Sequence, residues 1–297
     1  MTHDPRPFGR LLTAMVTPFT PDGALDVEGA AKLAAHLIDE QRNDALVVSG
    51  TTGESPTTTD AEKETLLRAV IEAVGDRAKV IAGVGTNNTA HTIELAHTAE
   101  KAGAHGLLVV TPYYNKPPQA GIAHHFRTVA DAVGLPVMVY DIPHRAGTAI
   151  ATETMCRIAE HGRIVAVKDA KGDLIESSRV LSRTDLAYYS GDDAATLPLL
   201  SIGGVGLVGT STHFTGSMAK DMIEAYERGD VTGALALHRR AMPLFTGIFR
   251  VPGTMLVKAG LNALGRPAGP VRSPLVDASD AELDQLRSDA AAAGIGL

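Results

Sequence analysis

Short apolar runs recur along the chain and alternate with segments of helical period. The runs lack a strict polar–apolar alternation, as expected for strands of a parallel sheet that is buried on both faces. Most of them are followed by a helical pattern, as in residues 59–75 and 88–103. The apolar runs span residues 11–18, 45–50, 79–85, 106–112, 136–141, 164–169, 186–191 and 204–210. Eight such units in roughly 200 residues predict an α/β fold, the (β/α)8 TIM barrel.

A doubly wound sheet is the alternative arrangement of strand–helix units. It usually has fewer units and carries a glycine-rich nucleotide-binding turn after its first strand, which residues 15–23, MVTPFTPDG, do not provide. After residue 215 the pattern changes, because four helical segments follow one another without a strand between them. We therefore predict a catalytic barrel over residues 1–224 and a C-terminal helical domain over residues 225–297.

Composition and charge exclude several classes of function. The 297 residues are 44% hydrophobic, which is enough for a large core, but only 4% aromatic and without tryptophan. Few aromatic residues argue against a stacking platform for bases. A net charge of −7 with no run of Lys or Arg argues against binding to nucleic acid or to an anionic membrane surface.

The cysteine and histidine content indicates the cellular compartment and the kind of site to expect. The single cysteine, Cys156, excludes an internal disulfide and sits in a helical pattern as a packed core residue. No apolar leader and no apolar stretch of membrane-spanning length are present, so we predict a cytoplasmic protein without membrane contact. The eleven histidines show no metal-ligand spacing, and no phosphate-binding or dinucleotide motif occurs, so we expect neither a metal nor a bound cofactor.

Lysine closes the sixth apolar run, at the strand end where a barrel carries its catalytic groups. Lys168 follows four apolar residues in IVAVKDAKG, residues 164–172. Either its ammonium reaches solvent past the strand end, or burial lowers its pKa and leaves a neutral amine that forms a Schiff base with a carbonyl. Lys171 reads as a solvated loop lysine. Lys258, in a helical pattern, is expected to reach solvent along its stem.

Two further strand ends carry groups suited to such chemistry. Tyr140 closes the preceding strand and is a candidate acid–base group, although tyrosine is also common at a barrel rim. Residues 49–55, SGTTGES, form a glycine-punctuated turn with Thr51 and Thr52. Such a turn either cradles an anion such as a carboxylate or is simply a tight turn with hydroxyl caps.

Six motifs in order along the chain resemble the dihydrodipicolinate synthase (4-hydroxy-tetrahydrodipicolinate synthase) family. This family belongs to the pyruvate-dependent class I aldolases, together with N-acetylneuraminate lyase. The resemblance runs from about residue 10 to the C-terminal helices. The motifs are GTTGES (50–55), GVGTNNT (83–89), TPYYNKP (111–117), YDIPHRAG (140–147), VAVKDAKG (165–172) and SGDDA (190–194).

The resemblance implies a lyase that holds pyruvate as an imine on Lys168, with no cofactor beyond that covalent bond. Thr51 and Thr52 are implied to bind the pyruvate carboxylate, and Tyr140 to transfer protons. Thr51 is implied to link Tyr140 to Tyr114 from a neighbouring subunit of a homotetramer, a dimer of dimers.

The second substrate implied by the resemblance is L-aspartate-4-semialdehyde, in diaminopimelate and lysine synthesis. Arg145 is implied to bind its carboxylate, while Gly191 and Val208 line the pocket beside the imine. Two alternatives remain open at this point. One is a related aldolase acting on keto-deoxy sugar acids, and the other is a catalytically silent regulatory relative.

Some positions depart from the family pattern. His144 stands where many relatives carry a small residue and is interpreted as a bulkier rim residue. Residues 208–214, VGTSTHF, are unusually polar for the eighth strand end. Where lysine-inhibited members carry two histidines and a glutamate, this chain has Asp60, Lys63 and His91. Because a cation at Lys63 repels the ammonium of lysine, we expect weak or absent feedback inhibition.

Overall fold

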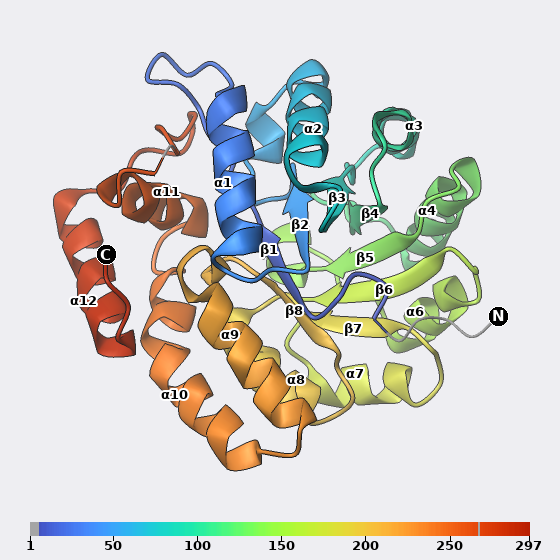
Figure 1. Ribbon diagram of the computed structural model, residues 1–297. Helices are drawn as coiled ribbons and strands as arrows, with labels where there is room; N and C mark the ends of the chain where they lie inside the picture. The colour runs from blue at the N-terminus through green and yellow to red at the C-terminus, as the bar shows by residue number, and fades with distance from the viewer. Residues whose placement is uncertain (1–5, 267) are drawn as a thin grey trace.

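Eight parallel strands close into a barrel in the computed structural model, which describes residues 6–266 and 268–297 (Figure 1). The strands follow one another around the barrel in chain order, and β1 pairs with β8 to close it. The strands are β1 (Leu11–Ala14), β2 (Ala45–Val48), β3 (Lys79–Gly83), β4 (Gly106–Val110), β5 (Val137–Asp141), β6 (Ile164–Asp169), β7 (Ala187–Ser190) and β8 (Gly206–Gly209). The predicted TIM barrel is confirmed.

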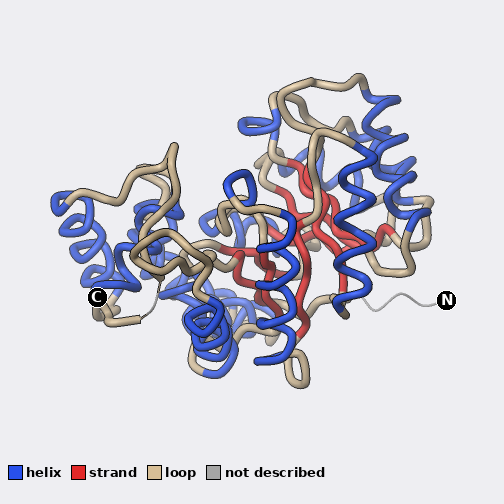
Figure 2. The backbone as a smooth tube through the Cα atoms, turned by 90° about the horizontal axis from the view of Figure 1, so that it is seen from above, coloured by secondary structure: helices blue, strands red, loops and turns tan. Residues whose placement is uncertain are grey.

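Helices enclose the strands on the outside of the barrel (Figure 2). Each of the seven connections between consecutive strands contains a helix, and α9 follows β8; two 3₁₀ turns, η1 (Ser55–Thr57) and η2 (Asp193–Ala195), lie on the rim. The helices up to the end of the barrel are α1 (Val27–Asp39), α2 (Asp60–Val74), α3 (Thr89–Ala102), α4 (Gln119–Ala132), α5 (Pro143–Ala146), α6 (Thr152–Ala159), α7 (Leu174–Leu181), α8 (Thr196–Leu200) and α9 (Thr212–Glu227). The α2 helix begins with a capping box between Thr59 and Glu62, which satisfies the free N–H groups of its first turn.

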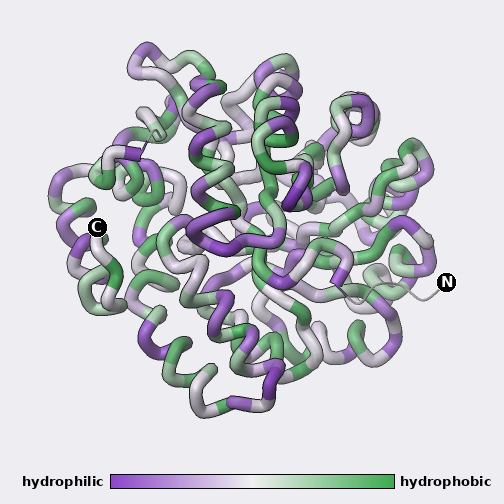
Figure 3. The backbone as a smooth tube through the Cα atoms, viewed as in Figure 1, coloured by the Kyte–Doolittle hydropathy of each residue, from purple (hydrophilic) through white to green (hydrophobic). Residues whose placement is uncertain are grey.

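The strands bury both of their faces, which explains the continuous apolar runs. Alternate side chains point inward, where Leu12, Val47 and Met138 fill the barrel. The others point outward against the helices, as Leu46 and Val80 do. The helices themselves carry hydrophobic and hydrophilic positions side by side (Figure 3). Such a fold leaves the strand ends as the place for polar side chains.

The C-terminal segment is helical, as predicted. It comprises α10 (Val231–Gly247), α11 (Gly253–Ala263) and α12 (Asp280–Ala293). Residues of α9 and α10 share one apolar cluster that includes Met222 and Phe245, so the segment packs directly on the barrel. The boundary after residue 224 falls in the last turn of α9, and the division into two domains stays a prediction. No helix among the described residues is long and apolar enough to cross a membrane.

The structure corrects one prediction in this segment. Lys258 in α11 does not reach solvent, because only 1% of its surface is exposed and its ammonium lies 2.7 Å from a carboxylate oxygen of Glu54. The apolar neighbours of Lys258 in the sequence place it on the buried face of the helix. Cys156, in contrast, is half-buried and packs against the core.

Candidate active site

A cavity of about 880 Å³ opens where the strands end. Its walls come from the loops after β2, β5, β6, β7 and β8, and from the C-terminal segment at residues 245–254 and 274–275. It brings together six of the eight residues that the sequence indicated: Thr51, Thr52, Tyr140, Arg145, Lys168 and Gly191. Of the other two, Val208 is buried in the barrel interior in the same cluster as Tyr140, and Tyr114 lies outside the cavity of its own chain.

Lys168 stands at the floor of this cavity near the end of β6. The strand pairing places it directly opposite Tyr140 of β5, and its Nζ lies 4.4 Å from the centre of the Tyr140 ring. Only 5% of the residue is exposed. Burial lowers the pKa of Lys168 to about 8; the charge of Asp193 opposes this shift and that of Arg145 adds to it. An amine with that pKa is neutral in roughly a tenth of molecules at pH 7.

Tyr140 keeps its phenol proton in this setting. Burial raises its pKa above the usual value, while the charge of Arg145 and a hydrogen bond with the Thr51 side chain oppose the shift. The phenol therefore stays a hydrogen-bond donor at neutral pH and lies next to the amine. This pairing of a neutral acid with a poorly solvated amine suits proton transfer during imine formation.

The turn after β2 presents its two threonines differently. Thr51 is exposed at the cavity wall, whereas Thr52 is buried and its hydroxyl lies 3.3 Å from that of Thr210. The turn has left-handed backbone at Ser49 (φ 56°) and Glu54 (φ 55°), which bends the chain sharply on both sides of the threonines. Both threonines line the cavity, and a hydroxyl-bearing turn of this kind is a suitable setting for a carboxylate.

Asp193 is a candidate site residue that sequence analysis did not single out. Its carboxylate is fully buried and accepts hydrogen bonds from the N–H groups of Thr210 and Ser211 and from the Ser211 hydroxyl, at 2.5–3.3 Å. These donors account for the polar end of β8. The signal in the sequence was the pair Asp192–Asp193 in SGDDA, but only the fold shows which of the two turns inward.

The same polar segment contains a buried histidine. His213 is 1% exposed; its Nε2 accepts the N–H of Val16 at 3.2 Å and its Nδ1 donates to the Thr210 carbonyl at 2.8 Å. Burial lowers its pKa to about 4, so the ring stays neutral at physiological pH. His213 therefore joins the segment after β8 to the segment after β1 through hydrogen bonds at both ring nitrogens.

Arg145 and His144 lie on the short helix α5 at the cavity rim. Both side chains are exposed and line the cavity. The guanidinium is close enough to influence the pKa of both Tyr140 and Lys168. Its fork of donors suits a carboxylate that enters from the open side. His144 occupies the rim, as the sequence indicated.

Tyr114 projects from the loop after β4 in an unusual way. It adopts a left-handed backbone (φ 71°) and 88% of its surface is exposed. The next residue, Asn115, donates through Nδ2 to the carbonyl of Asn87 at 2.9 Å and so holds the loop. A contribution of Tyr114 to a neighbouring subunit stays a prediction.

The contacts of Lys171 contradict a second prediction. Lys171 is not a solvated loop lysine, because its Nζ lies 4.0 Å from Oδ2 of Asp141 and donates to the Ile150 carbonyl at 3.5 Å. Burial raises the pKa of Asp141 to about 7, and the Lys171 charge opposes that shift. Lys171 is thus the counter-charge of a buried carboxyl behind Tyr140.

Asp60, Lys63 and His91 form a cluster away from the cavity. The Lys63 ammonium donates to the Thr58 carbonyl at 2.6 Å and lies 3.6 Å from Asp60, which also contacts His91 Nε2 at 2.8 Å. The Lys63 side chain is 13% exposed. The cation is therefore already paired within the chain. The described residues contain no group of three or more His, Cys, Asp and Glu side chains that could hold a metal ion.

Comparison with known proteins gives a consistent result. The family model of the Dihydrodipicolinate synthetase family matches residues 7–293. The 4-hydroxy-tetrahydrodipicolinate synthase of Acidothermus cellulolyticus is 70% identical over 98% of this chain and 94% of its own.

Solved structures show the same likeness. The lysine-bound DHDPS of Cyanidioschyzon merolae is 46% identical with a TM-score of 0.95, and covers 97% of this chain and 99% of its own. The chloride-inhibited dihydrodipicolinate synthase of Acinetobacter baumannii, complexed with pyruvate, is 32% identical with a TM-score of 0.93 over 97% and 99%. The motifs at the strand ends indicated the same family, and the chain belongs to the Dihydrodipicolinate synthetase family.

Proposed function

We propose that this chain is a lyase that condenses pyruvate with L-aspartate-4-semialdehyde, the 4-hydroxy-tetrahydrodipicolinate synthase reaction, through a Schiff base on Lys168. One observation carries the mechanism: Lys168 is 5% exposed at the cavity floor, and its Nζ lies 4.4 Å from the Tyr140 ring centre. The activity agrees with that of the relative from Acidothermus cellulolyticus, which is 70% identical. The product serves diaminopimelate and lysine synthesis.

Imine formation uses the neutral amine of Lys168. The amine attacks the carbonyl carbon of pyruvate, and the oxygen takes a proton from the Tyr140 phenol while the nitrogen gives up a proton. Loss of the new hydroxyl as water leaves the imine. Thr51 and Thr52 hold the pyruvate carboxylate through hydroxyl and N–H groups, which fixes the carbonyl within reach of the amine.

Carbon–carbon bond formation follows from the imine. The methyl carbon loses a proton to give an enamine, which attacks the aldehyde carbon, and the aldehyde oxygen takes up a proton. The amine of the second substrate then attacks the imine carbon, and the bond to Lys168 breaks. Arg145 binds the carboxylate of this substrate at the rim, while Gly191 and Val208 shape the floor beside the imine. The imine itself stabilises the carbanion, so the reaction needs no metal or separate cofactor.

The exposed Tyr114 fits a shared site in a homotetramer built as a dimer of dimers. In this arrangement Tyr114 of one subunit completes the proton path from Thr51 and Tyr140 of another. Mixing Lys168→Ala subunits with Tyr114→Phe subunits tests this directly. Recovery of activity in the mixed sample, above that of either variant alone, is expected; a fully active monomer contradicts the proposal.

The proposed reaction is tested by trapping and by turnover. Borohydride added with pyruvate should leave a reduced adduct on Lys168, read by mass spectrometry of the peptide. A coupled assay should show turnover with L-aspartate-4-semialdehyde and not with sugar-acid aldehydes. An adduct with turnover only of sugar acids indicates the related aldolase, and the absence of an adduct indicates a silent relative. Either result overturns the proposal.

A further inference from the structure

The turn that carries Thr51 and Thr52 contains a buried charge at its far end. Glu54 is 3% exposed and adopts a left-handed backbone (φ 55°) that side-chain-bearing residues rarely take. A buried carboxylate is strongly unfavourable unless it is paired and hydrogen-bonded. The groups that pair with Glu54 therefore also determine whether the turn keeps its left-handed backbone conformation.

Three contacts from the C-terminal segment reach this turn. The Lys258 ammonium of α11 lies 2.7 Å from Oε1 of Glu54, and the backbone N–H of Arg272 donates to Oε2 at 2.8 Å. One turn earlier in α11, the Thr254 hydroxyl donates to the carbonyl of Thr52 at 3.1 Å. Both oxygens of Glu54 and the carbonyl of a predicted substrate-binding residue are thus held by one distant part of the chain.

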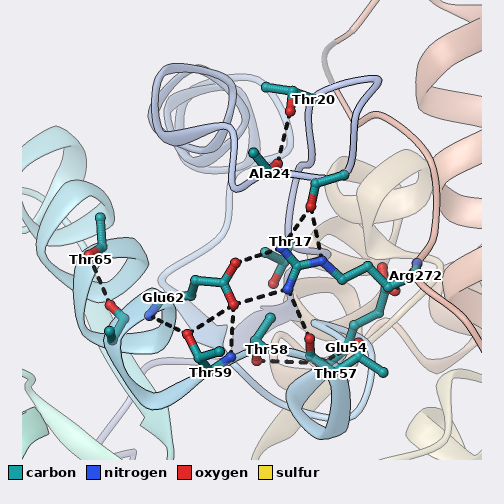
Figure 4. A network of polar contacts seen from close by, with 12 residues as sticks. Thr17, Thr20, Ala24, Glu54, Thr57, Thr58, Thr59, Glu62, Thr65 and Arg272 are labelled. Atoms are coloured by element: carbon teal, nitrogen blue, oxygen red, sulfur yellow. Dashed lines mark hydrogen bonds and ion pairs between the residues drawn. The ribbon is translucent and has the colours of Figure 1, made fainter.

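The partners of Glu54 are themselves fixed. Lys258 Nζ and the Arg272 guanidinium each lie 4.0 Å from the ring centre of Phe19, and Lys258 also donates to the Pro270 carbonyl at 2.7 Å. Figure 4 shows the Arg272 guanidinium between Glu62 and the turn, where it donates to both carboxylate oxygens and to the Thr57 carbonyl. The Arg272 contact holds the pKa of Glu62 at about 2.

We propose that the C-terminal segment positions the substrate-carboxylate turn, with Lys258 and Thr254 as positioning residues that hold Glu54 and Thr52 in place. This inference deepens the proposed function and rests on it, because it assumes that Thr51 and Thr52 bind the pyruvate carboxylate. It assigns to α11 a part in pyruvate affinity, although Lys258 does not line the cavity.

Steady-state kinetics of Lys258→Met with both substrates test this inference. Loss of the Glu54 partner should raise KM for pyruvate by about tenfold, with a change of less than about twofold in KM for the aldehyde. A general loss of folded protein lowers kcat and leaves both KM values unchanged. An unchanged pyruvate KM in a folded variant overturns the inference.

Thr254 supplies a milder variant in case Lys258→Met fails to fold. Thr254→Val keeps the shape and removes one hydrogen bond, so KM for pyruvate should rise by about fivefold. Thr254→Ser retains the hydroxyl and should restore the wild-type value. Equal pyruvate KM values for the valine and serine variants contradict the positioning role.

Arg240→Met is the matched control within the same segment. Arg240 joins α10 to the end of α12 through the Ala293 carbonyl at 2.8 Å and does not touch the turn. Arg240→Met should leave KM for pyruvate unchanged. If it raises this KM as much as Lys258→Met does, any loosening of the C-terminal segment has the same effect, and the specific role of Lys258 is refuted. Borohydride trapping of the wild-type protein distinguishes failure of the proposed function from failure of this inference. If no adduct forms, the proposed function is refuted. If an adduct forms but the variants keep the wild-type KM for pyruvate, only this inference is refuted.

Discussion

Two buried lysines, Lys168 and Lys258, stand in similar surroundings but differ in their contact partners. Each is at most 5% exposed, and each ammonium lies over an aromatic ring, Tyr140 at 4.4 Å and Phe19 at 4.0 Å. Lys258 also has a carboxylate at 2.7 Å, whereas no carboxylate among the described residues lies within 4.0 Å of Lys168. Burial lowers the pKa of both. The contact partner therefore distinguishes Lys258, an ion-paired cation, from Lys168, the proposed nucleophile.

Lys168→Met should have the largest effect, a loss of activity without a loss of stability. Methionine preserves the length of the side chain but cannot form an imine, so turnover should fall by on the order of 1000-fold or more. The free energy of unfolding should stay the same or rise, because no unpaired amine remains buried. Initial rates and urea denaturation measure the two effects. Turnover above a tenth of wild type shows that the nucleophile is wrongly assigned.

Glu54→Gln tests the partner of Lys258 and, in contrast to Lys168→Met, should lower stability. It leaves the buried Lys258 charge without its partner and should lower the free energy of unfolding by about 3–5 kcal/mol. The exposed pair Arg183–Glu153 is the control, because Arg183→Gln should cost less than about 1 kcal/mol. Urea denaturation compares both variants with wild type. Equal losses for the two pairs contradict a structural role specific to Lys258.

Stability should depend on pH through Lys168. Its pKa is about 8 in the folded chain and 10.5 in the reference state, so the unfolded chain binds more protons between these values. The free energy of unfolding should therefore rise from pH 8 to 10.5, by roughly 3 kcal/mol from this group. Subtracting the pH profile of Lys168→Met isolates the contribution. A difference that falls over this range, or is flat, disproves the lowered pKa.

Asp193→Asn should shift the pH dependence of imine formation. The Asp193 charge raises the pKa of Lys168, so its removal lowers that pKa further and increases the neutral fraction at a given pH. The midpoint of the rise in trapping rate with pH should move to lower pH. The amide oxygen still accepts an N–H bond from the end of β8. A slower reaction with an unchanged midpoint assigns Asp193 a purely structural role.

Lys63 offers the smallest expected effect. This third, partly buried lysine is paired with Asp60 and the Thr58 carbonyl. The family resemblance implies that its position belongs to the inhibitor site of lysine-inhibited members. A millimolar concentration of lysine should change the initial rate by less than about twofold, because two ammonium groups repel each other. Clear inhibition by sub-millimolar lysine contradicts this prediction, and Lys63→His then tests whether the cation limits affinity.

Sequence predicts those features of this molecule that depend on neighbours along the chain. The eight apolar runs indicate the barrel because each strand is buried on both faces, and Lys168 was found because a charge ends such a run. Lys258 and Lys171 were misjudged because their partners, Glu54 and Asp141, come from other parts of the chain. Asp193 was missed for the same reason: its donors lie after β8.

Two glycines beneath the cavity set a limit for enzyme engineering. A methyl group on Gly191 would meet the Lys168 stem at 3.0 Å, and one on Gly209 would meet Asp193 at 2.9 Å. A side chain at either glycine would therefore crowd Lys168 or Asp193. Another part of the cavity wall, residues 245–251, contains exposed side chains such as Phe249 and does not include Thr254, which contacts the turn. Attempts to accept longer 2-oxo acids or bulkier aldehydes should begin on that wall.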